Sequence, residues 1–304
     1  MRRGFFTALL YLLAVGLVLA FATPGYTQKG SDYVGSDACK GCHEDAFKSY
    51  TKNVHGKKYV PGSPEVRNGC EACHGPGKTH VDKGGGKGTI IAFRQTENTA
   101  LKTDPCMSCH GDSKNTTFWN VSKHKNEGVS CDQCHSGHST AKYNLKAKDP
   151  DVCYKCHQQV RFQANKQSHH PIREGKMNCG SCHTPHGSMG KNGIKGDSVQ
   201  ELCFKCHADK RGPFVWEHPP VEENCLSCHT PHGSNTNTLL VAKTPQLCQA
   251  CHDWSRHPGT AYTNFNSFGG PAPSSRFDGR NCLTCHSQVH GTTGSSVRGK
   301  YFLR

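Results

Sequence analysis

The amino-acid sequence predicts an elongated, mostly irregular chain with short α-helices, built from five repeated modules. Three observations support this class. The pentapeptide C-x-x-C-H occurs ten times in 304 residues. A lone histidine follows each copy, so the order of motif and histidine repeats along the chain. Only 34% of the residues are hydrophobic, and the 33 glycines and 16 prolines favour turns, so the polypeptide alone does not have the composition of a conventional packed core.

The C-x-x-C-H motif is typical of a covalent c-type haem attachment site. Two cysteines three positions apart on one helical turn point the same way and can form thioethers with one porphyrin, and the adjacent histidine can ligate its iron. The motifs use all 20 cysteines: Cys39, Cys42, Cys70, Cys73, Cys106, Cys109, Cys131, Cys134, Cys153, Cys156, Cys179, Cys182, Cys203, Cys206, Cys225, Cys228, Cys248, Cys251, Cys282 and Cys285. The predicted proximal ligands are His43, His74, His110, His135, His157, His183, His207, His229, His252 and His286.

Two other uses of cysteine compete with haem attachment. Zinc proteins contain C-x-x-C pairs, and exported proteins use cysteines for disulfides. Neither use requires a histidine directly after every pair, and only 21 histidines are present in the whole chain. The sequence therefore predicts ten covalent haems c, in a multihaem cytochrome c, in preference to a zinc or disulfide protein.

The ten lone histidines predict the second axial ligand of each iron. A second neutral imidazole closes the iron and gives a low-spin, electron-transferring centre. The candidates are His55, His80, His124, His138, His170, His186, His218, His232, His257 and His290. His169 falls outside the scheme, because His170 shares a following proline with His218 and His257, and proline favours an extended residue before it.

Which lone histidine serves which haem is left open by the sequence, with one restriction. His186 lies three residues after His183, on nearly the same face of the chain, so it cannot easily reach the far side of the same porphyrin. It is expected to ligate a neighbouring haem, and the same reasoning applies to His138 and His232. Such cross-ligation would hold consecutive haems in close contact.

The predicted domain organisation has two parts. Residues 1–22 have the pattern of a signal peptide, with two arginines, an apolar run and a cleavage site after Ala22 or as late as Thr27; an uncleaved membrane anchor is the alternative. Residues 23–304 form the decahaem electron-transfer domain. Its five two-haem modules span approximately residues 36–105, 106–150, 151–200, 201–245 and 246–304. Export is expected to place the protein in the periplasm.

The formal net charge of +14 by itself favours an anionic partner such as nucleic acid. Removal of Arg2 and Arg3 with the signal peptide leaves +12, and two propionates on each of ten haems bring the total to about −8. The lysines are therefore interpreted as propionate partners and solvated surface, and no nucleic-acid binding is expected.

Secondary structure is expected to be sparse. Short helices over residues 36–50 and 199–208 carry C-x-x-C-H turns, and residues 84–86, three glycines in a basic loop, form a flexible connector. Trp119, Trp216 and Trp254 are expected to pack on haem edges.

The repeated C-H-T-P-H-G of residues 182–187 and 228–233, together with K-R-G-P-F-V-W-E-H-P-P at 210–220, resembles the decahaem MtrA/PioA/DmsE family of periplasmic cytochromes. The resemblance covers essentially the whole chain after the signal peptide. It implies an elongated wire of bis-histidine haems that several members insert into an outer-membrane β-barrel porin. It also implies inner-membrane or periplasmic electron donors or acceptors, and an extracellular multihaem cytochrome as a further partner.

The sequence thus favours an electron-transfer protein, not an enzyme, associated with or inserted through the outer membrane as part of a porin–cytochrome conduit for extracellular electron transfer. Its polar surface cannot face lipid, so a crossing requires a closed protein sheath. A soluble periplasmic electron shuttle is the alternative. A multihaem reductase of a small oxyanion is a weaker one, because it needs an open iron and no C-x-x-C-K motif occurs.

Overall fold

The computed structural model describes residues 32–252 and 281–303. The predicted signal peptide at residues 1–22, Trp254 and His257 lie outside these ranges. The chain divides into two units, Met1–Glu97 and Asn98–Arg304. The first unit carries the first two C-x-x-C-H sites and the second unit carries the other eight.

Both units are made of short helices joined by turns and irregular segments. The first unit contains α2 (Ser36–Lys40), α3 (Glu44–Lys52), η1 (Val54–Gly56), η2 (Pro64–Val66), α4 (Glu71–His74) and α5 (Lys78–Asp82). The second contains α6 (Thr99–His110), η3 (Trp119–Val121), α7 (Lys123–Asn126), α8 (Cys131–Cys134), η4 (Lys142–Asn144), α9 (Asp151–Tyr154), α10 (Gln158–Ala164), α11 (Cys179–Cys182), η5 (Lys191–Gly193), α12 (Val199–Phe204), η6 (Ala208–Lys210), α13 (Pro219–Glu223), η7 (Cys225–Ser227), η8 (Asn237–Leu239), α14 (Gln246–Gln249), η10 (Cys282–Thr284) and α15 (Val297–Lys300).

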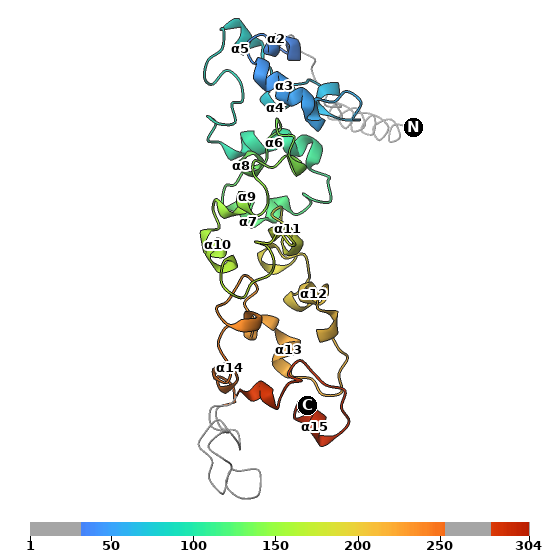
Figure 1. The fold of residues 1–304 in the computed structure, drawn as a ribbon. Helices are drawn as coiled ribbons and strands as arrows, with labels where there is room; N and C mark the ends of the chain where they lie inside the picture. Colours follow the sequence, from blue (N-terminus) through green and yellow to red (C-terminus); the bar gives the residue numbers. More distant parts are fainter. Residues whose placement is uncertain (1–31, 253–280, 304) are drawn as a thin grey trace, which may run out of the picture. The chain divides into compact units, whose positions relative to one another are not determined.

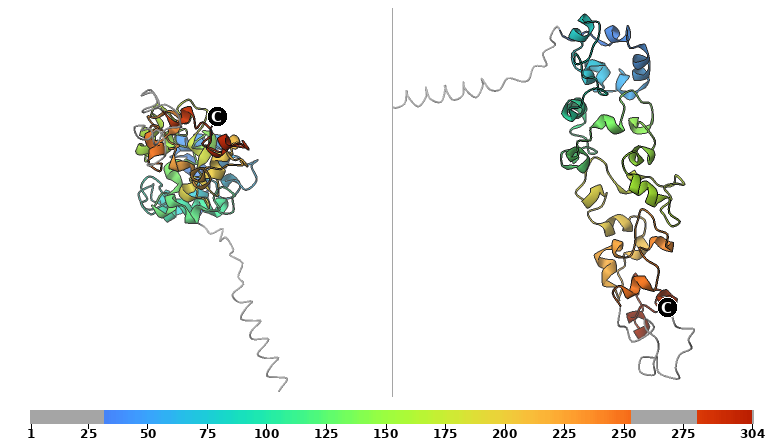
Figure 2. Two further views of the ribbon diagram at one scale, coloured as in Figure 1. Left: turned by 90° about the horizontal axis from the view of Figure 1, so that it is seen from below. Right: turned by 90° about the vertical axis from the view of Figure 1, so that its left-hand side faces the viewer.

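The predicted class, a mostly irregular chain with short α-helices, is confirmed. Over residues 32–252 and 281–303 the only strand-like pairing consists of isolated bridges. Within the second unit, the elements follow the order of the chain from α6 and α8 to α14 and α15 (Figure 1, Figure 2). None of the helices in the described ranges is long and apolar enough to cross a membrane.

The two predicted helices are shorter than expected. Residues 36–50 form two helices, because His43 leaves the helical conformation at φ −118° and ψ 49° and caps α3. Over residues 199–208, α12 ends at Phe204 and η6 begins at Ala208, because His207 takes a similar conformation, φ −105° and ψ 50°. In both cases the helical turn of the motif ends at its histidine, and a new helical segment starts just after it. The end of the motif, and not the helix propensity of the flanking residues, therefore sets these boundaries.

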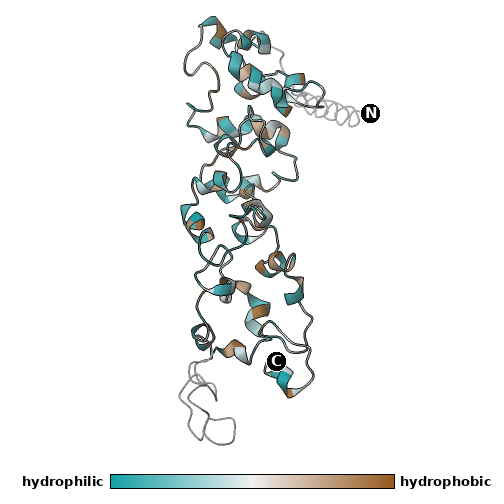
Figure 3. Cartoon of the chain, viewed as in Figure 1, coloured by the Kyte–Doolittle hydropathy of each residue, from teal (hydrophilic) through white to brown (hydrophobic). Residues whose placement is uncertain are grey.

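The polypeptide forms very little hydrophobic core. Among the described residues, the buried hydrophobic ones are Tyr50, Trp119, Ala164 and Ile194. Hydrophilic and hydrophobic residues alternate along the helices without a continuous apolar layer (Figure 3). This scarcity agrees with the composition, and it means that large apolar groups other than side chains must supply most of the interior.

A buried carboxylate organises the first unit. The side chain of Glu71, only 3% exposed, accepts hydrogen bonds from the backbone N–H groups of Val34 at 3.0 Å, Gly35 at 2.8 Å and Gly77 at 2.7 Å. Glu71 lies inside the second C-x-x-C-H motif, and Gly35 directly precedes α2, which carries the first. The carboxylate therefore holds the two sites of this module together.

A tight turn follows the second site of three successive modules. Its two central residues have positive φ: Tyr143 and Asn144, Asn192 and Gly193, Thr238 and Leu239. Two antiparallel backbone hydrogen bonds close it onto the motif, as in Thr184 N–H to Gly193 O at 2.8 Å and Lys195 N–H to Cys182 O at 2.9 Å. Positive φ is strained for Tyr, Thr and Leu, and such strain persists only where surrounding contacts impose it.

Backbone contacts join neighbouring modules of the second unit. Ser168 pairs with Ser234 through hydrogen bonds of 2.9 and 2.8 Å, and Trp216 pairs with Thr292 through two bonds of 3.0 Å. In each bridge, one residue lies two positions before the first lone histidine of its module. Its partner lies two positions after the second lone histidine of the next module. The bridge therefore fixes these two histidine segments side by side.

Gly233 lies between such segments, with φ of +144°. A Cβ atom there would collide with the backbone carbonyl of Gln163 in the preceding module. We expect Gly233→Ala to destabilise the haem-loaded protein by about 2 to 3 kcal/mol, because the conformation is strained and the two modules must separate. Chemical denaturation followed by circular dichroism measures this change.

Gly128→Ala is the matched control, because Gly128 also has positive φ, +73°, but faces open space within 4 Å. It is expected to cost only the conformational part, about 1 kcal/mol. Equal losses in the two variants would contradict a close contact at Gly233.

Candidate haem-binding sites

Each C-x-x-C-H motif forms one helical turn. In nine motifs, the backbone N–H of the histidine donates to the carbonyl of the first cysteine at 2.9 to 3.1 Å. The tenth motif, which ends in His110, forms the last turn of α6. None of the 20 cysteines forms a disulfide, and all are exposed or partly exposed. Both thiols of a motif are therefore on the same turn and open to covalent attachment.

Seven motif histidines lie opposite a predicted distal histidine. The separations between ring centres fall between 5.9 and 6.4 Å. The pairs are His43 with His80, His157 with His124, His135 with His186, His207 with His170, His183 with His232, His252 with His218 and His229 with His290.

This separation fits a haem iron between the two rings. With metal–nitrogen bonds of about 2 Å and each ring centre about 1.1 Å behind its nitrogen, two axial imidazoles have centres roughly 6.2 Å apart. Aromatic rings that pack without a metal between them have centres about 4.5 to 7 Å apart, so a single pair would be weak support for coordination. In the seven pairs the ring-centre separations differ by no more than half an ångström, and each pair joins one motif histidine to one lone histidine. This regularity fits coordination of an iron between the rings.

Neighbouring modules of the second unit exchange histidines reciprocally. The first lone histidine of a module lies opposite the first motif histidine of the next module, as His170 does for His207. The second lone histidine lies opposite the second motif histidine of the preceding module, as His232 does for His183. The same exchange joins modules two and three, and modules four and five. We call this arrangement the reciprocal exchange.

His186 and His232, each expected to ligate a neighbouring haem, lie opposite motif histidines other than the one three residues before them, and these belong to the preceding module. His80 differs, because it lies opposite His43 within its own module. His55 lies in η1. The backbone N–H of His138 donates a hydrogen bond to Ser136 Oγ at 3.3 Å. His257 lies outside the described residues.

Hydrogen bonds at Nδ1 orient the motif histidines of the second sites. His135, His183 and His229 lie 2.8, 3.1 and 2.9 Å from the carbonyl oxygens of the first positive-φ residue of the following turn, Tyr143, Asn192 and Thr238. His74 and His286 reach Ile91 O at 2.7 Å and Tyr301 O at 2.6 Å. Because a carbonyl can only accept, Nδ1 carries the proton and the lone pair of Nε2 is left available to a metal.

The first lone histidines are held in the same way across module boundaries. Nδ1 of His124 lies 2.8 Å from Pro185 O, and Nδ1 of His170 lies 2.8 Å from Pro231 O. In each case the acceptor is the residue directly before the second lone histidine of the next module. The first lone histidine of a reciprocal exchange is therefore positioned by the backbone directly before the second. His218 also agrees with the predicted extended conformation before proline, at φ −94° and ψ 111°.

Four of the distal candidates, His186, His218, His232 and His290, favour the neutral imidazole that binds iron. Burial lowers the pKa of His186, and the neighbouring His135 lowers it further. Burial and the opposite motif histidine act likewise on the pKa of His218 and His232. For His290, burial lowers the pKa first, followed by the charge of Lys210. A neutral ring keeps its nitrogen lone pair available for the metal.

The thiols of consecutive sites lie next to one another. Within every module the first cysteines of the two sites interact, namely Cys39 with Cys70, Cys106 with Cys131, Cys153 with Cys179, Cys203 with Cys225 and Cys248 with Cys282. Between modules, Cys134 lies near Cys153, Cys182 near Cys206 and Cys228 near Cys251. Burial, and next the adjacent Cys225 thiol, raise the pKa of Cys203 to about 11. Haem edges attached at these sulfurs would follow one another without a gap through the second unit.

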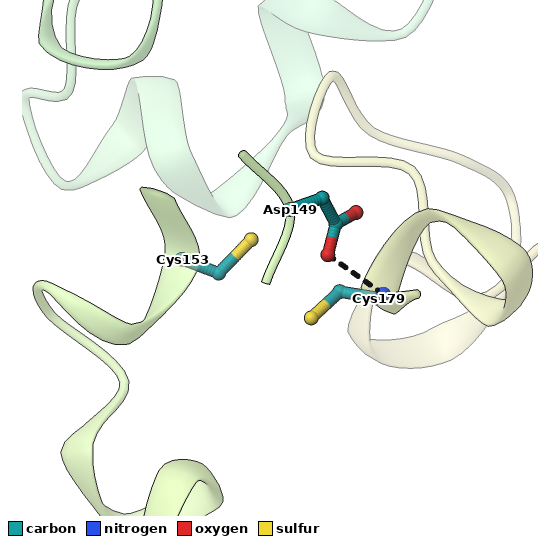
Figure 4. Close-up of side chains that lie close together, drawn as sticks. All are labelled: Asp149, Cys153 and Cys179. Carbon is teal, nitrogen blue, oxygen red and sulfur yellow. Dashed lines mark hydrogen bonds between the residues drawn. The ribbon is translucent and has the colours of Figure 1, made fainter. Parts of the chain in front are cut away.

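Asp149, Cys153 and Cys179 form a group in which one ligand atom from each side chain lies within 4.8 Å of the others (Figure 4). Such a group resembles part of a metal site, but structural zinc needs four ligands. The two thiols belong to different C-x-x-C-H motifs, and the carboxylate accepts hydrogen bonds from the N–H groups of Cys179 and Gly180, both at 3.0 Å. Sequence reasoning missed Asp149, whose only signal is its position four residues before a motif.

The adjacent His169 and His170 have different surroundings. Nε2 of His169 lies 3.1 Å from a carboxylate oxygen of Glu174, and its Nδ1 lies 2.6 Å from Lys166 O. Both ring nitrogens of His169 are therefore engaged with groups of its own loop. His170 faces His207 instead. The choice of His170 as the candidate ligand agrees with this arrangement.

The described tryptophans lie beside the sites. Trp119 is 5% exposed and meets the ring of His186 edge-on, with centres 6.2 Å apart. Trp216 takes part in the bridge to Thr292, and its indole N–H donates to Gly294 O at 3.0 Å. Trp119 therefore packs against a distal candidate, whereas Trp216 mainly joins two modules.

Comparison with known proteins agrees with the repeated sites. A family model described as the doubled CXXCH motif matches residues 124–162, 169–212 and 218–257. Multiheme cytochrome MtrA of Shewanella baltica (strain OS185) is 42% identical over 290 residues, which cover 93% of this chain and 84% of that protein. Cytochrome c-type protein NrfB of Haemophilus influenzae (strain ATCC 51907 / DSM 11121 / KW20 / Rd) is 27% identical over 115 residues, 36% of this chain and 46% of that protein.

The pair His169 and His170 offers a direct test of the distal ligands. We expect His170→Ala to leave the iron bonded to His207 five-coordinate and high-spin, so about one-tenth of the irons would bind carbon monoxide in the reduced protein. Absorption and electron paramagnetic resonance spectra measure this fraction. His169→Ala removes a neighbouring imidazole of the same loop and is expected to leave every iron low-spin. Carbon monoxide binding in both variants, or in neither, would contradict the choice of His170.

Proposed function

The chain belongs to the family of the multihaem cytochrome MtrA, and we propose that each of its ten C-x-x-C-H sites carries one covalent haem c, forming a single electron-transfer chain. The observation that carries this proposal is the set of seven histidine pairs at the separation required by a six-coordinate iron. Haem supplies the redox chemistry, since its iron takes up and releases one electron between Fe(III) and Fe(II).

The protein residues attach, orient and space the cofactors. The two cysteines of each motif form the thioethers, and the motif histidine is the proximal ligand. In the described pairs the distal ligands are His80, His124, His170, His186, His218, His232 and His290, each serving the motif histidine opposite it. For His55, His138 and His257, distal ligation stays a prediction. Because two strong axial ligands fill both faces of the iron, the arrangement favours electron transfer over substrate binding.

The adjacent cysteines support conduction in sequence order. Attachment at Cys153 and Cys179, whose sulfurs lie within 4.8 Å of each other, would bring the edges of two porphyrins into contact. Equivalent neighbours link the successive sites of the second unit. Short edge distances and fixed axial ligands together suit rapid transfer with little rearrangement.

We propose further that the protein is exported to the periplasm and joins an outer-membrane β-barrel porin, through which it connects periplasmic or inner-membrane cytochromes with an extracellular multihaem cytochrome. Relationship to the MtrA protein supports this role. A soluble periplasmic shuttle uses the same wire without the porin. A small-oxyanion reductase is disfavoured because the paired imidazoles leave no open iron at these seven sites.

Haem stoichiometry tests the attachment sites. Intact mass measurement of the purified protein is expected to show ten haems, and Cys179→Ala combined with Cys182→Ala is expected to show nine, because both thioethers of one site are lost. Ser181→Ala changes the same turn but neither thiol, and it should retain ten. Ten haems in the double variant would refute attachment at this motif.

Isolation of the tagged protein from outer membranes in mild detergent tests the porin. A conduit is expected to yield a β-barrel protein in fixed ratio, and liposomes containing both proteins should pass electrons from an internal donor to an external acceptor. Liposomes with the barrel alone are the control. Recovery of all haem-stained protein free in the periplasmic fraction would instead favour the shuttle.

A further inference from the structure

In modules one to three, the residue four positions before the first cysteine contacts the second C-x-x-C-H site of the same module. In module three this residue is Asp149, which precedes Cys153 by four residues and hydrogen-bonds the start of α11, where Cys179 begins the second site. Figure 4 shows the carboxylate beside the two thiols, with a dashed line to the backbone nitrogen of Cys179. The negative charge therefore lies beside the attachment points of two haems at once.

In the other modules of the second unit, the position equivalent to Asp149 does not carry a carboxylate. In module two, the equivalent Lys102 forms an ion pair of 3.4 Å with Asp132, and both side chains are less than 20% exposed. In module four the equivalent residue is Val199, and the neighbouring amide of Gln200 donates to the backbone carbonyls of Glu222 and Glu223. In module five it is Thr244, four residues before Cys248. Asp149 makes no ion pair with any residue that the structure describes.

We propose that Asp149 is an electrostatic tuning residue that lowers the reduction potentials of the two haems of module three relative to their neighbours. This inference rests on the proposed function, because it requires haems at Cys153 and Cys179. Each iron gains one electron on reduction and loses one unit of positive charge, with no transfer of atoms. A nearby carboxylate stabilises the more positive Fe(III) state, and the partly enclosed site weakens solvent screening.

Partial shielding of Asp149 makes its charge effective. Its oxygens accept hydrogen bonds from two backbone N–H groups. These bonds hold the carboxylate beside the sulfurs and keep it from rotating toward solvent. A low-potential pair in the second unit holds fewer electrons than its neighbours at a given poise. Asp149 thereby lowers the electron occupancy of module three relative to modules two and four.

Potentiometric titration of the intact ten-haem protein at pH 7 tests the proposal, with absorption as the readout. In Asp149→Asn, about one-fifth of the total amplitude, the share of two irons in ten, is expected to move to higher potential. At fixed poise, the ratio of oxidised to reduced iron in that share should fall about three- to tenfold. Asp149→Glu keeps the charge and should retain most of the original curve.

Asp151→Asn is the matched control. Asp151 is exposed, belongs to the same module and lies two residues before Cys153, so its removal changes the net charge equally without removing a charge from the junction. Its shift should be clearly smaller, because water screens an exposed charge. A shift in Asp149→Asn no larger than that of Asp151→Asn would overturn the proposal.

The reverse substitution tests the same idea without removing a native contact. Thr244 is followed by a proline and precedes Cys248 by four residues, as Asp149 does for Cys153. Thr244→Asp is expected to move another one-fifth of the amplitude to lower potential, and an unchanged curve would overturn the proposal. Fewer than ten low-spin haems in the wild-type protein would contradict the proposed function. Ten low-spin haems with unchanged potentials in the variants would contradict only the role of Asp149.

Discussion

The second unit depends on one constraint, the pairing of histidines from neighbouring modules. The two imidazole rings of a pair lie as far apart as two axial ligands of one iron. Few hydrophobic residues are buried over residues 32–252 and 281–303, and in the proposed function these pairs, with haem between them, take the place of a core. In the reciprocal exchange, each module supplies a histidine to its neighbour and receives one in return. Under the proposed ligation, neither module completes its sites without the other, which would couple folding to cofactor attachment.

Backbone geometry makes this exchange specific. The strained turns at Tyr143, Asn192 and Thr238 present a carbonyl to a motif histidine, and the bridge between Ser168 and Ser234 aligns two lone-histidine segments. Gly233 permits that close approach because it has no Cβ. Conformational strain is thus concentrated beside the ligands, where it fixes ring orientation and tautomer.

Repetition of the sites need not make them electrically equal. The junction within a module is spanned by Glu71 in the first, by the ion pair of Lys102 with Asp132 in the second and by Asp149 in the third. These groups serve the same mechanical purpose, which is to join two haem sites. Their charges differ, so the local field differs from one module to the next while the ligands stay the same.

The sequence by itself determined the cofactor chemistry, the repeat and the class of fold, because C-x-x-C-H and the lone histidines are local patterns whose chemistry depends on spacing alone. It also indicated that His186 serves a haem other than that of His183, since three residues cannot easily span a porphyrin. Only the tertiary structure decided that His186 faces His135, that His170 and not His169 faces the next module, and that Asp149 lies between two sites. These contacts join residues some 30 to 60 positions apart through strained turns and backbone bridges, and no short motif encodes such a distance.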